Sequence, residues 1–327
     1  MKLNLDQLKA ITKGAVEVTE ENGCFHFYRF TKIQQELYGE LRPQYNEKVL
    51  ATAGVRLGLE TDSEYLAFDY SLQTGSSRPY GFFDVYENGT LKHHFGDMVP
   101  SKFEGRGEIS LSQGMKKVEV HFPWSCVTTL ANVEVADGAQ VKPIEKKRRM
   151  IAFGDSITQG YSAIYPSLTY ISRIADMLDA ECFNKAIGGD KFFPELAGTA
   201  DPVIPDLITV AYGTNDWSHD PREVVEEKCC QFYQALAKSY PNAQVFAITP
   251  IWRKDGNKET KFGAPQPAVA ELIADVCAEI PGITVIRGDG FVPWVEDFFE
   301  DKYLHPNDMG FDFYARNLYN ALIPYIK

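Results

Sequence analysis

The sequence lacks the long apolar segments that anchor or export a protein. No apolar run approaches the roughly 18 residues of a membrane-spanning helix. The opening segment, MKLNLDQLKAITKG, contains no apolar region of the kind that a signal peptide carries. There is also no internal repeat and no low-complexity tract. These absences predict a cytoplasmic protein with no membrane partner.

Positive charge and metal-binding cysteine patterns are scarce as well. The formal net charge is −12, and the one basic run, Lys146 to Arg149, is too short to form a binding patch. We therefore expect neither nucleic acid nor an anionic membrane surface as a partner. The six cysteines show no CxxC or CxxH spacing, which argues against a zinc site and favours reduced, mostly buried thiols.

The length of 327 residues favours two domains, and the pattern of apolar residues changes near residue 146. Before that point apolar and polar residues alternate, as in Leu66 to Leu72, which is typical of strands. Asn88-Gly89, between two such runs, is the strongest short-range signal of a hairpin. Many short strands separated by turns predict a β-sandwich or jelly roll for residues 1–146.

Residues 147–327 show strands alternating with helices, which predicts a parallel sheet covered by helices on both faces. Asp220, Pro221 and Glu223 have the pattern of a helix start, with Asp220 as its cap. In such sheets the functional sites lie beyond the carboxyl ends of the strands. The expected strands are 150–153, 182–187, 206–212, 244–248 and 283–286, and the expected helices are 167–178, 268–280, and one from about 308.

Four short segments at those strand ends, or in a late loop that can reach them, carry the groups that ester hydrolysis needs. A serine hydroxyl becomes a good nucleophile only when a base takes its proton. Ser156 is the candidate nucleophile and His305, just before the last helix, is the candidate base. His219 is a rival imidazole, which we expect at the surface or in a supporting position beside the site, because a helix begins next to it. The four segments are Phe153 to Gly160, Ile187 to Asp190, Tyr212 to Asp216, and His305 to Asp308.

The remaining polar residues of these segments suit the stabilisation of an oxyanion. A glycine lets its backbone N–H approach a ligand closely, and an asparagine offers a neutral NH₂ group. Gly189 and Asn215, with the amide of Ser156, are therefore the candidate oxyanion donors. Asp301, four residues before His305, is the candidate acid that orients the imidazole.

Together the four segments resemble the blocks of the SGNH hydrolase superfamily, also called the GDSL esterase/lipase family. The resemblance covers about residues 150–327. It implies a three-layer α/β/α hydrolase domain with Ser156 as nucleophile, Gly189 and Asn215 as oxyanion donors, and His305 as base. The longer first segment resembles that of two-domain members, in which a β-sandwich, often suspected of carbohydrate contact, precedes the catalytic domain.

One position departs from the family pattern, which places the acid three residues before the histidine. Lys302 occupies that position here, and Asp301 lies one step further back. Either the loop takes one extra residue and Asp301 still acts, or a backbone carbonyl orients His305 in a catalytic dyad. Some carbohydrate esterases of this superfamily that carry an N-terminal jelly roll resemble the second case.

The residues and the resemblance lead us to expect a serine esterase for short acyl esters, with acetyl as the leading acyl group and an acetylated saccharide as the leading substrate. No metal and no organic cofactor is implied. The alternatives are a thioesterase or lysophospholipase, and a non-catalytic carbohydrate-binding protein on the same scaffold. Tyr161, Trp217 and Trp252 could line the pocket or serve only in packing. Exposed sheet edges make a homo-oligomer plausible.

Overall fold

The computed structural model describes residues 1–326, which divide into two compact units. The first unit holds residues 1–147 and 164–167, and the second holds residues 148–163 and the chain from 168 onward. Segment 164–167 therefore belongs to the first unit, although its sequence neighbours on both sides belong to the second. Within residues 1–326, no helix combines the length and the apolar character that crossing a membrane requires.

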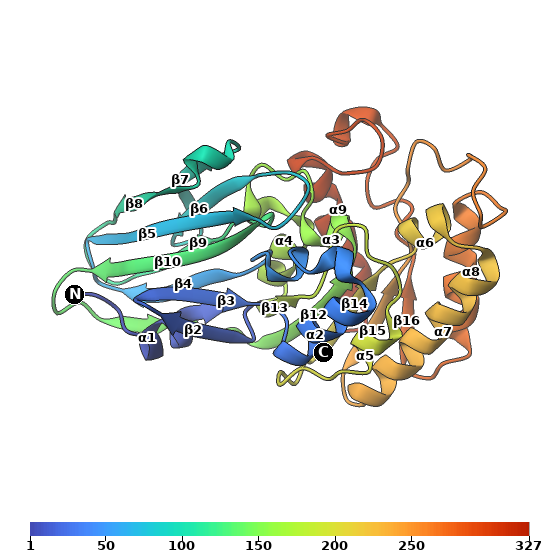
Figure 1. Ribbon diagram of the computed structural model, residues 1–327, viewed down its shortest axis with the longest axis horizontal. Helices are drawn as coiled ribbons and strands as arrows, with labels where there is room; N and C mark the ends of the chain where they lie inside the picture. Colours follow the sequence, from blue (N-terminus) through green and yellow to red (C-terminus); the bar gives the residue numbers. More distant parts are fainter. Residues whose placement is uncertain (327) are drawn as a thin grey trace. The chain divides into compact units, whose positions relative to one another are not determined.

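The first unit is built from two antiparallel sheets that bury their side chains in one common core (Figure 1). Phe68 from one sheet and Phe83 from the other have ring centroids 5.6 Å apart. One sheet has the order β1 (Thr12–Lys13), β4 (Arg56–Thr61), β9 (Lys116–His121), β6 (Gly81–Glu87) and β7 (Thr90–Asp97), with β11 (Val141–Pro143) also beside β4. The other has the order β2 (Glu17–Glu21), β3 (Cys24–Tyr28), β10 (Cys126–Val135), β5 (Tyr65–Thr74) and β8 (Glu104–Ser110).

The predicted hairpin is confirmed. The first unit also contains two helices that the sequence did not suggest. Asn88 and Gly89, between β6 and β7, have φ values of 48° and 77°, which is the left-handed pair that a tight type I′ turn requires. Helices α1 (Leu5–Ile11) and α2 (Lys32–Leu41) each begin with a capping box. The sequence interpretation missed both, because they are short and lie in a segment that otherwise alternates. The 3-10 turns of this unit are η1 (Pro43–Tyr45), η2 (Lys48–Leu50) and η3 (Pro100–Lys102).

A buried carboxylate fixes segment 164–167 within the first unit. Asp84 on β6 is fully buried, and its Oδ2 accepts hydrogen bonds from the backbone N (2.9 Å) and the Oγ (2.6 Å) of Ser167. Its Oδ1 lies 2.7 Å from Nδ1 of His94, whose ring centroid is 4.1 Å from that of Tyr165. A buried carboxylate is stable only when such donors satisfy it, so these contacts hold the segment firmly.

The second unit contains a sheet of five parallel strands, which confirms the predicted α/β fold. The strand that comes first in the sequence lies between the second and the third strands. The order in which strands are added across the sheet therefore reverses at this first strand. Ligand sites of such sheets form beyond the carboxyl ends of the strands at this reversal. The order across the sheet is β13 (Ala180–Asn184), β12 (Arg148–Gly154), β14 (Leu207–Ala211), β15 (Gln244–Ile248) and β16 (Ile283–Ile286).

The helices of the second unit form two groups on opposite sides of the sheet (Figure 1). In the first group, α4 and α9 pack together through Tyr170 and Tyr314, whose rings stack 4.0 Å apart. In the second group, α7 packs on both α5 and α8. The helices are α3 (Ser156–Gln159), α4 (Tyr170–Met177), α5 (Pro194–Ala197), α6 (Thr214–His219), α7 (Arg222–Ser239), α8 (Pro267–Ala278) and α9 (Asp308–Leu322), with the 3-10 turn η5 (Glu296–Phe298). The 3-10 turn η4 (Pro166–Leu168) begins within segment 164–167 of the first unit.

The predicted start of α7 is wrong by one residue and in its cap. Pro221 occupies the N-cap position and no side chain caps the helix. Asp220 instead ends α6, a short helix that the sequence did not suggest, and pairs with Lys191 at 2.5 Å. The acidic side chain is therefore used in a tertiary ion pair, which competes with local capping.

Candidate active site

Ser156 lies at the point where strand β12 turns into helix α3. Asp155 caps this helix, with its Oδ1 accepting the backbone N–H of Ile157 at 3.0 Å. Gly154 permits the turn, because a Cβ there would lie 2.2 Å from Oγ1 of Thr158. The chain thus presents the Ser156 hydroxyl at the carboxyl end of strand β12, with the residue itself 6% exposed.

The structure brings His305 to this serine across 149 residues of sequence. The Nε2 of His305 lies 2.9 Å from Oγ of Ser156, within hydrogen-bond reach for proton transfer. The Nδ1 on the other side of the ring lies 2.6 Å from Oδ2 of Asp301. The ring of Tyr161 packs on the imidazole, with centroids 4.5 Å apart. Hydroxyl, imidazole and carboxylate therefore form a continuous hydrogen-bonded series.

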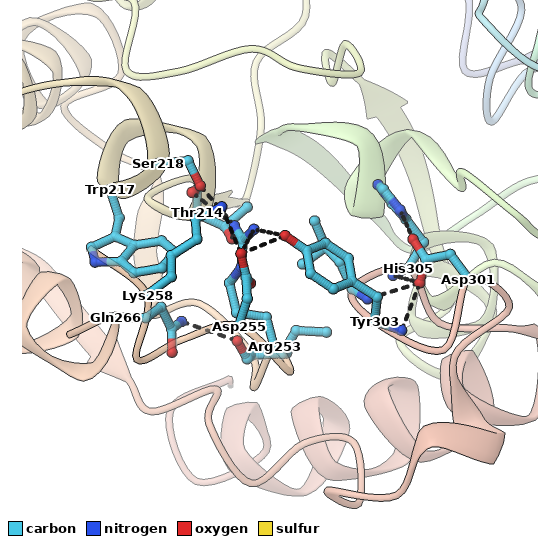
Figure 2. A network of polar contacts seen from close by, with 12 residues as sticks. Thr214, Trp217, Ser218, Arg253, Asp255, Lys258, Gln266, Asp301, Tyr303 and His305 are labelled. Carbon is cyan, nitrogen blue, oxygen red and sulfur yellow. Dashed lines mark hydrogen bonds and ion pairs between the residues drawn. The ribbon is translucent and has the colours of Figure 1, made fainter. Parts of the chain in front are cut away.

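Asp301 reaches the imidazole because the loop accommodates one extra residue. Lys302 has a φ of 59°, a left-handed conformation that is uncommon for a residue other than glycine. The Oδ1 of Asp301 accepts the backbone N–H groups of Tyr303, Leu304 and His305 at 2.8–3.1 Å (Figure 2). Of the two arrangements that the sequence left open, the structure has the longer loop with the carboxylate on the imidazole.

Hydrogen bonding keeps the Asp301 carboxyl ionised. Burial opposes the ionised form, but the hydrogen bonds from His305 and from the backbone outweigh it and hold the pKa of Asp301 well below its usual range. A carboxylate at this place favours the tautomer with the proton on Nδ1 of His305. That tautomer leaves Nε2 free to accept the proton of Ser156, as a general base must.

The candidate oxyanion donors come from the ends of the two strands that flank β12. Gly189 follows β13 and has a φ of 89°, and a Cβ on its neighbour Gly188 would lie 3.6 Å from Cβ of Ser156. Asn215, the second residue of α6, follows β14, and its Nδ2 donates to the carbonyl of Asp190 at 3.0 Å. One of the two Nδ2 hydrogens of Asn215 is used in that bond. The glycine segment is thus adjacent to the serine, and the asparagine is bonded to the residue that follows Gly189.

Two side chains that the sequence interpretation did not single out brace these donors. Gln159, in the same segment as the serine, accepts the backbone N–H of Gly188 at 2.7 Å through Oε1. Asp216 accepts the backbone N–H groups of Gly213 at 3.0 Å and Phe192 at 3.1 Å. Both residues lie within the four segments identified from the sequence, and this position is the sequence signal that could have revealed their supporting role.

Desolvation shifts the ionisation of two carboxyl groups below the site. Burial is the main cause that raises the pKa of Asp155 to about 7, against the bond from Ile157 and the charge of Arg253, which lower it. Burial likewise raises the pKa of Asp216 to about 7. These groups are fully buried and accept backbone hydrogen bonds, so they act on the geometry of the loops.

The remaining candidates occupy different environments. His219 is in α6, and its Nδ1 lies 2.8 Å from the carbonyl of Asn215, so this imidazole contacts its own helix. Trp217 is fully buried in packing, and its Nε1 donates to the carbonyl of Ala264 at 2.8 Å. Trp252 is partly exposed and stacks on Trp294, with ring centroids 6.4 Å apart and planes at 17°.

Within residues 1–326, no group of three or more histidine, cysteine, aspartate or glutamate side chains is arranged to hold a metal ion.

Residues 152–313 match the model of the GDSL-like Lipase/Acylhydrolase family. No curated protein matches the chain.

Several solved structures share the fold of the chain. A salicylyl-acyltransferase from a tetracycline biosynthetic pathway is 22% identical, with a TM-score of 0.82 over 96% of this chain and 94% of its own. A protein from Bacteroides ovatus ATCC 8483, described as a GDSL-like lipase, is 18% identical, with a TM-score of 0.78 over 98% and 97%. A family two carbohydrate esterase from Cellvibrio japonicus is 15% identical, with a TM-score of 0.66 over 97% and 96%.

At these identities the solved structures show similarity of fold, and the family model adds the sequence match that the fold alone does not give. The resemblance inferred from the four segments is confirmed. Residues 152–313 thus match the GDSL-like lipase/acylhydrolase family in sequence, and the solved structures agree with that match in fold.

Proposed function

We propose that this protein is a serine esterase that removes short acyl groups, acetyl above all, from a saccharide or a similarly polar alcohol. Its family is one of acylhydrolases, which supports ester hydrolysis. The observation that carries the proposal is the alignment of three groups: Oγ of Ser156 is 2.9 Å from Nε2 of His305, whose Nδ1 is 2.6 Å from Asp301. This is the arrangement that activates a hydroxyl at neutral pH.

In the first half of the proposed reaction, Oγ of Ser156 attacks the acyl carbon while Nε2 of His305 takes the hydroxyl proton. Asp301 stabilises the resulting imidazolium through its bond to Nδ1. The tetrahedral intermediate then collapses, the alcohol leaves with the proton from His305, and the acyl group remains on Ser156. In the second half, His305 takes a proton from water, the hydroxide attacks the acyl-enzyme, and the acid is released with Ser156 restored.

We assign the oxyanion of both intermediates to the backbone N–H groups of Ser156 and Gly189 and to Nδ2 of Asn215. These donors come from the ends of three adjacent parallel strands, so the sheet holds them in place before the substrate arrives. Fixed donors of this kind contribute about 3–4 kcal/mol each to the stabilisation of a transition state.

The carbohydrate part of the proposal has two supports. Solved structures with this fold include family two carbohydrate esterases. The stacked indoles of Trp252 and Trp294, of which Trp294 is 62% exposed, offer a flat aromatic surface of the kind that marks ligand-binding sites. We further propose that residues 1–146 form a separate β-sandwich domain, because its two sheets share one hydrophobic core.

The first experiment compares hydrolysis of p-nitrophenyl acetate by the wild type, Ser156→Ala and, as a matched control, Ser239→Ala at the end of α7. We expect turnover by the wild type and the control, and its loss in Ser156→Ala. A serine-directed fluorophosphonate should label the wild type and spare Ser156→Ala. If the wild type hydrolyses no short ester and takes no label, the non-catalytic carbohydrate-binding function replaces the esterase.

The second experiment determines the substrate class. Acetylated saccharides, simple acyl esters of increasing length, thioesters and lysophospholipids are compared by kcat/KM, with both the acid and the alcohol product quantified. Highest kcat/KM on acetylated saccharides supports the proposal, and highest values on thioesters or lysophospholipids favour the alternative functions. Measuring the acid also separates transfer to water from transfer to another alcohol.

A further inference from the structure

Arg253 is a buried arginine that lies just beyond strand β15 and contacts two separate parts of the site (Figure 2). It is 5% exposed, although an arginine is rarely buried unless its charge is paired. The reaction described above does not use it. Its contacts nevertheless reach the helix that carries Asn215 and the loop that carries Asp301 and His305.

The first set of contacts is with helix α6. The Nη1 of Arg253 donates to Oγ1 of Thr214 at 3.0 Å, to the carbonyl of Thr214 at 3.3 Å and to Oγ of Ser218 at 2.9 Å. The guanidinium carbon also lies 4.9 Å from the ring centroid of Trp217, in a cation–π contact. Thr214 and Ser218 lie on either side of Asn215 in sequence, so these bonds fix the turn that presents its amide.

The second set of contacts is with the loop from Asp301 to His305. The Nη2 of Arg253 donates to the hydroxyl of Tyr303 at 2.6 Å, and the guanidinium lies 5.3 Å from the Tyr303 ring centroid. The backbone N–H of Tyr303 in turn donates to Oδ1 of Asp301 at 3.0 Å. The residue after Arg253, Lys254, adds a bond from its backbone N to the carbonyl of Tyr303 at 3.0 Å.

Asp255 completes the group and balances its charge. Its carboxylate accepts hydrogen bonds from Nε of Arg253 at 2.6 Å, from Nη2 of Arg253 at 3.2 Å and from the Tyr303 hydroxyl at 2.6 Å. Burial opposes its ionised form, but the bonds from Arg253, Lys258 and Tyr303 prevail and lower the pKa of Asp255 to about 2. All N–H groups of the Arg253 guanidinium therefore donate hydrogen bonds. Their acceptors lie in three segments, namely helix α6, Asp255 and the loop that contains Tyr303.

We propose that Arg253 is a positioning residue that holds the oxyanion helix α6 and the loop of Asp301 and His305 in a fixed relation to each other. This inference rests on the proposed esterase function. The fork of an arginine has five donors spread over three nitrogens in one plane, whereas a lysine ammonium has three donors on a single nitrogen and cannot reproduce all of these bonds. Loss of the fork lets the amide of Asn215 and the imidazole of His305 move independently, and misplacement by about 1 Å can lower a rate by about 100-fold.

The test measures kcat and KM for p-nitrophenyl acetate in Arg253→Lys, Tyr303→Phe and Ser218→Ala. Arg287→Lys serves as the matched control, because Arg287 makes an exposed ion pair with Glu271. We expect Arg253→Lys to lower kcat by about 10–100-fold with KM changed by less than about threefold. Tyr303→Phe removes the hydroxyl that accepts from Arg253 and donates to Asp255, and it should lower kcat by about 3–10-fold.

A double-mutant cycle separates positioning from general support of the fold. If Arg253 acts partly through Asn215, then Arg253→Lys should cost clearly less in an Asn215→Ala background than in the wild type. Active sites are counted with the fluorophosphonate, so that kcat refers to folded enzyme. A lowered melting temperature with unchanged kcat, or full additivity in the cycle, overturns the inference.

The outcomes distinguish this inference from the function on which it rests. An inactive wild type contradicts the esterase function itself. An active wild type with a folded, fully active Arg253→Lys contradicts only the role of Arg253. If Arg253→Lys does not fold, Tyr303→Phe and Ser218→Ala carry the test, because each removes one link and keeps the buried charge pair; wild-type kcat in both then overturns the inference.

Discussion

Oδ2 of Asp301 lies 2.6 Å from Nδ1 of His305, although these residues are four apart and the family pattern places its acid three before the histidine. The left-handed Lys302 takes up the additional residue. Three backbone N–H groups on Oδ1 keep the carboxylate in place while Oδ2 faces the imidazole. The geometry therefore supports a triad in which the acid is held by its own loop.

Replacing this acid tests whether the third member matters for the reaction. Asp301→Asn retains an oxygen for the backbone donors but places an amide against Nδ1, which favours the wrong tautomer of His305. We expect kcat on p-nitrophenyl acetate to fall by about 10³–10⁴-fold, as for the acid of other serine triads. A near-normal rate would mean that a Ser156–His305 dyad suffices. Asp297→Asn, at an exposed carboxylate that pairs with Lys302, is the control.

Removing the amide of Asn215 tests the proposed oxyanion site. Asn215→Ala should lower kcat by about 10²–10³-fold, because one donor to the oxyanion is lost. The KM should change little, since the donor acts mainly in the transition state. Asn242→Ala, at the amino end of β15, provides the comparison. Turnover that stays at the wild-type level in Asn215→Ala would remove this residue from the site.

The buried carboxyl of Asp155 predicts a loss of stability as the pH rises. Its pKa is raised to about 7 in the folded state, so the folded state binds the proton more tightly than the unfolded state. Stability is therefore highest below the unfolded pKa and falls by up to about 1.4 kcal/mol per pH unit until the pH passes the folded pKa. Above the folded pKa, the free energy of unfolding stays lower by the full cost of ionising the buried carboxyl of Asp155.

Asp155→Asn removes this ionisation while keeping a side chain that caps helices well. The free energy of unfolding, measured with urea, should increase relative to the wild type, and the difference should grow by about 1–3 kcal/mol between about pH 5 and about pH 8. Glu226→Gln, on a helix surface, should show no such growth. If the free energies of unfolding of Asp155→Asn and the wild type differ by the same amount at both pH values, the raised pKa of Asp155 is contradicted.

Much of the site could be predicted because its groups follow strands that the sequence marks clearly. Ser156, Gly189 and Asn215 each follow a short apolar strand, and parallel strands place their carboxyl ends at one edge. The helix α6 around Asn215 was missed because it has only six residues and follows an N-cap glycine, Gly213, whose φ is 119°. A helix so short shows no apolar periodicity.

The role of Arg253 could not be predicted, because its partners are distant in sequence. Its hydrogen bonds join residues 39 and 50 positions away, and nothing in the order of residues links these three segments. The position of segment 164–167 in the first unit is hidden for the same reason, since Asp84 is 83 residues from Ser167. Tertiary hydrogen bonds of this kind follow from the fold and leave no local pattern.

The exposed indole of Trp294 gives the last prediction, which concerns the alcohol part of the substrate. Trp252 stacks on Trp294 and packs on Phe299, with centroids 5.3 Å apart, and Phe299 pairs with Pro306 beside His305. This aromatic surface therefore adjoins the loop of the base, and under the proposed function a sugar ring would contact it while the ester lies at Ser156. Trp294→Ala should raise the KM for an acetylated oligosaccharide by about 2–10-fold, the loss expected for one aromatic contact.

The same variant should leave kcat and KM for p-nitrophenyl acetate unchanged, because this ester has no sugar ring to contact the indole. Ile204→Ala, at an apolar side chain that is 77% exposed elsewhere on the surface, controls for the loss of exposed apolar area. An equal rise in KM on both substrates would indicate a general disturbance of the loop. An unchanged KM on the oligosaccharide would remove the indoles from the substrate site and weaken the case for a saccharide.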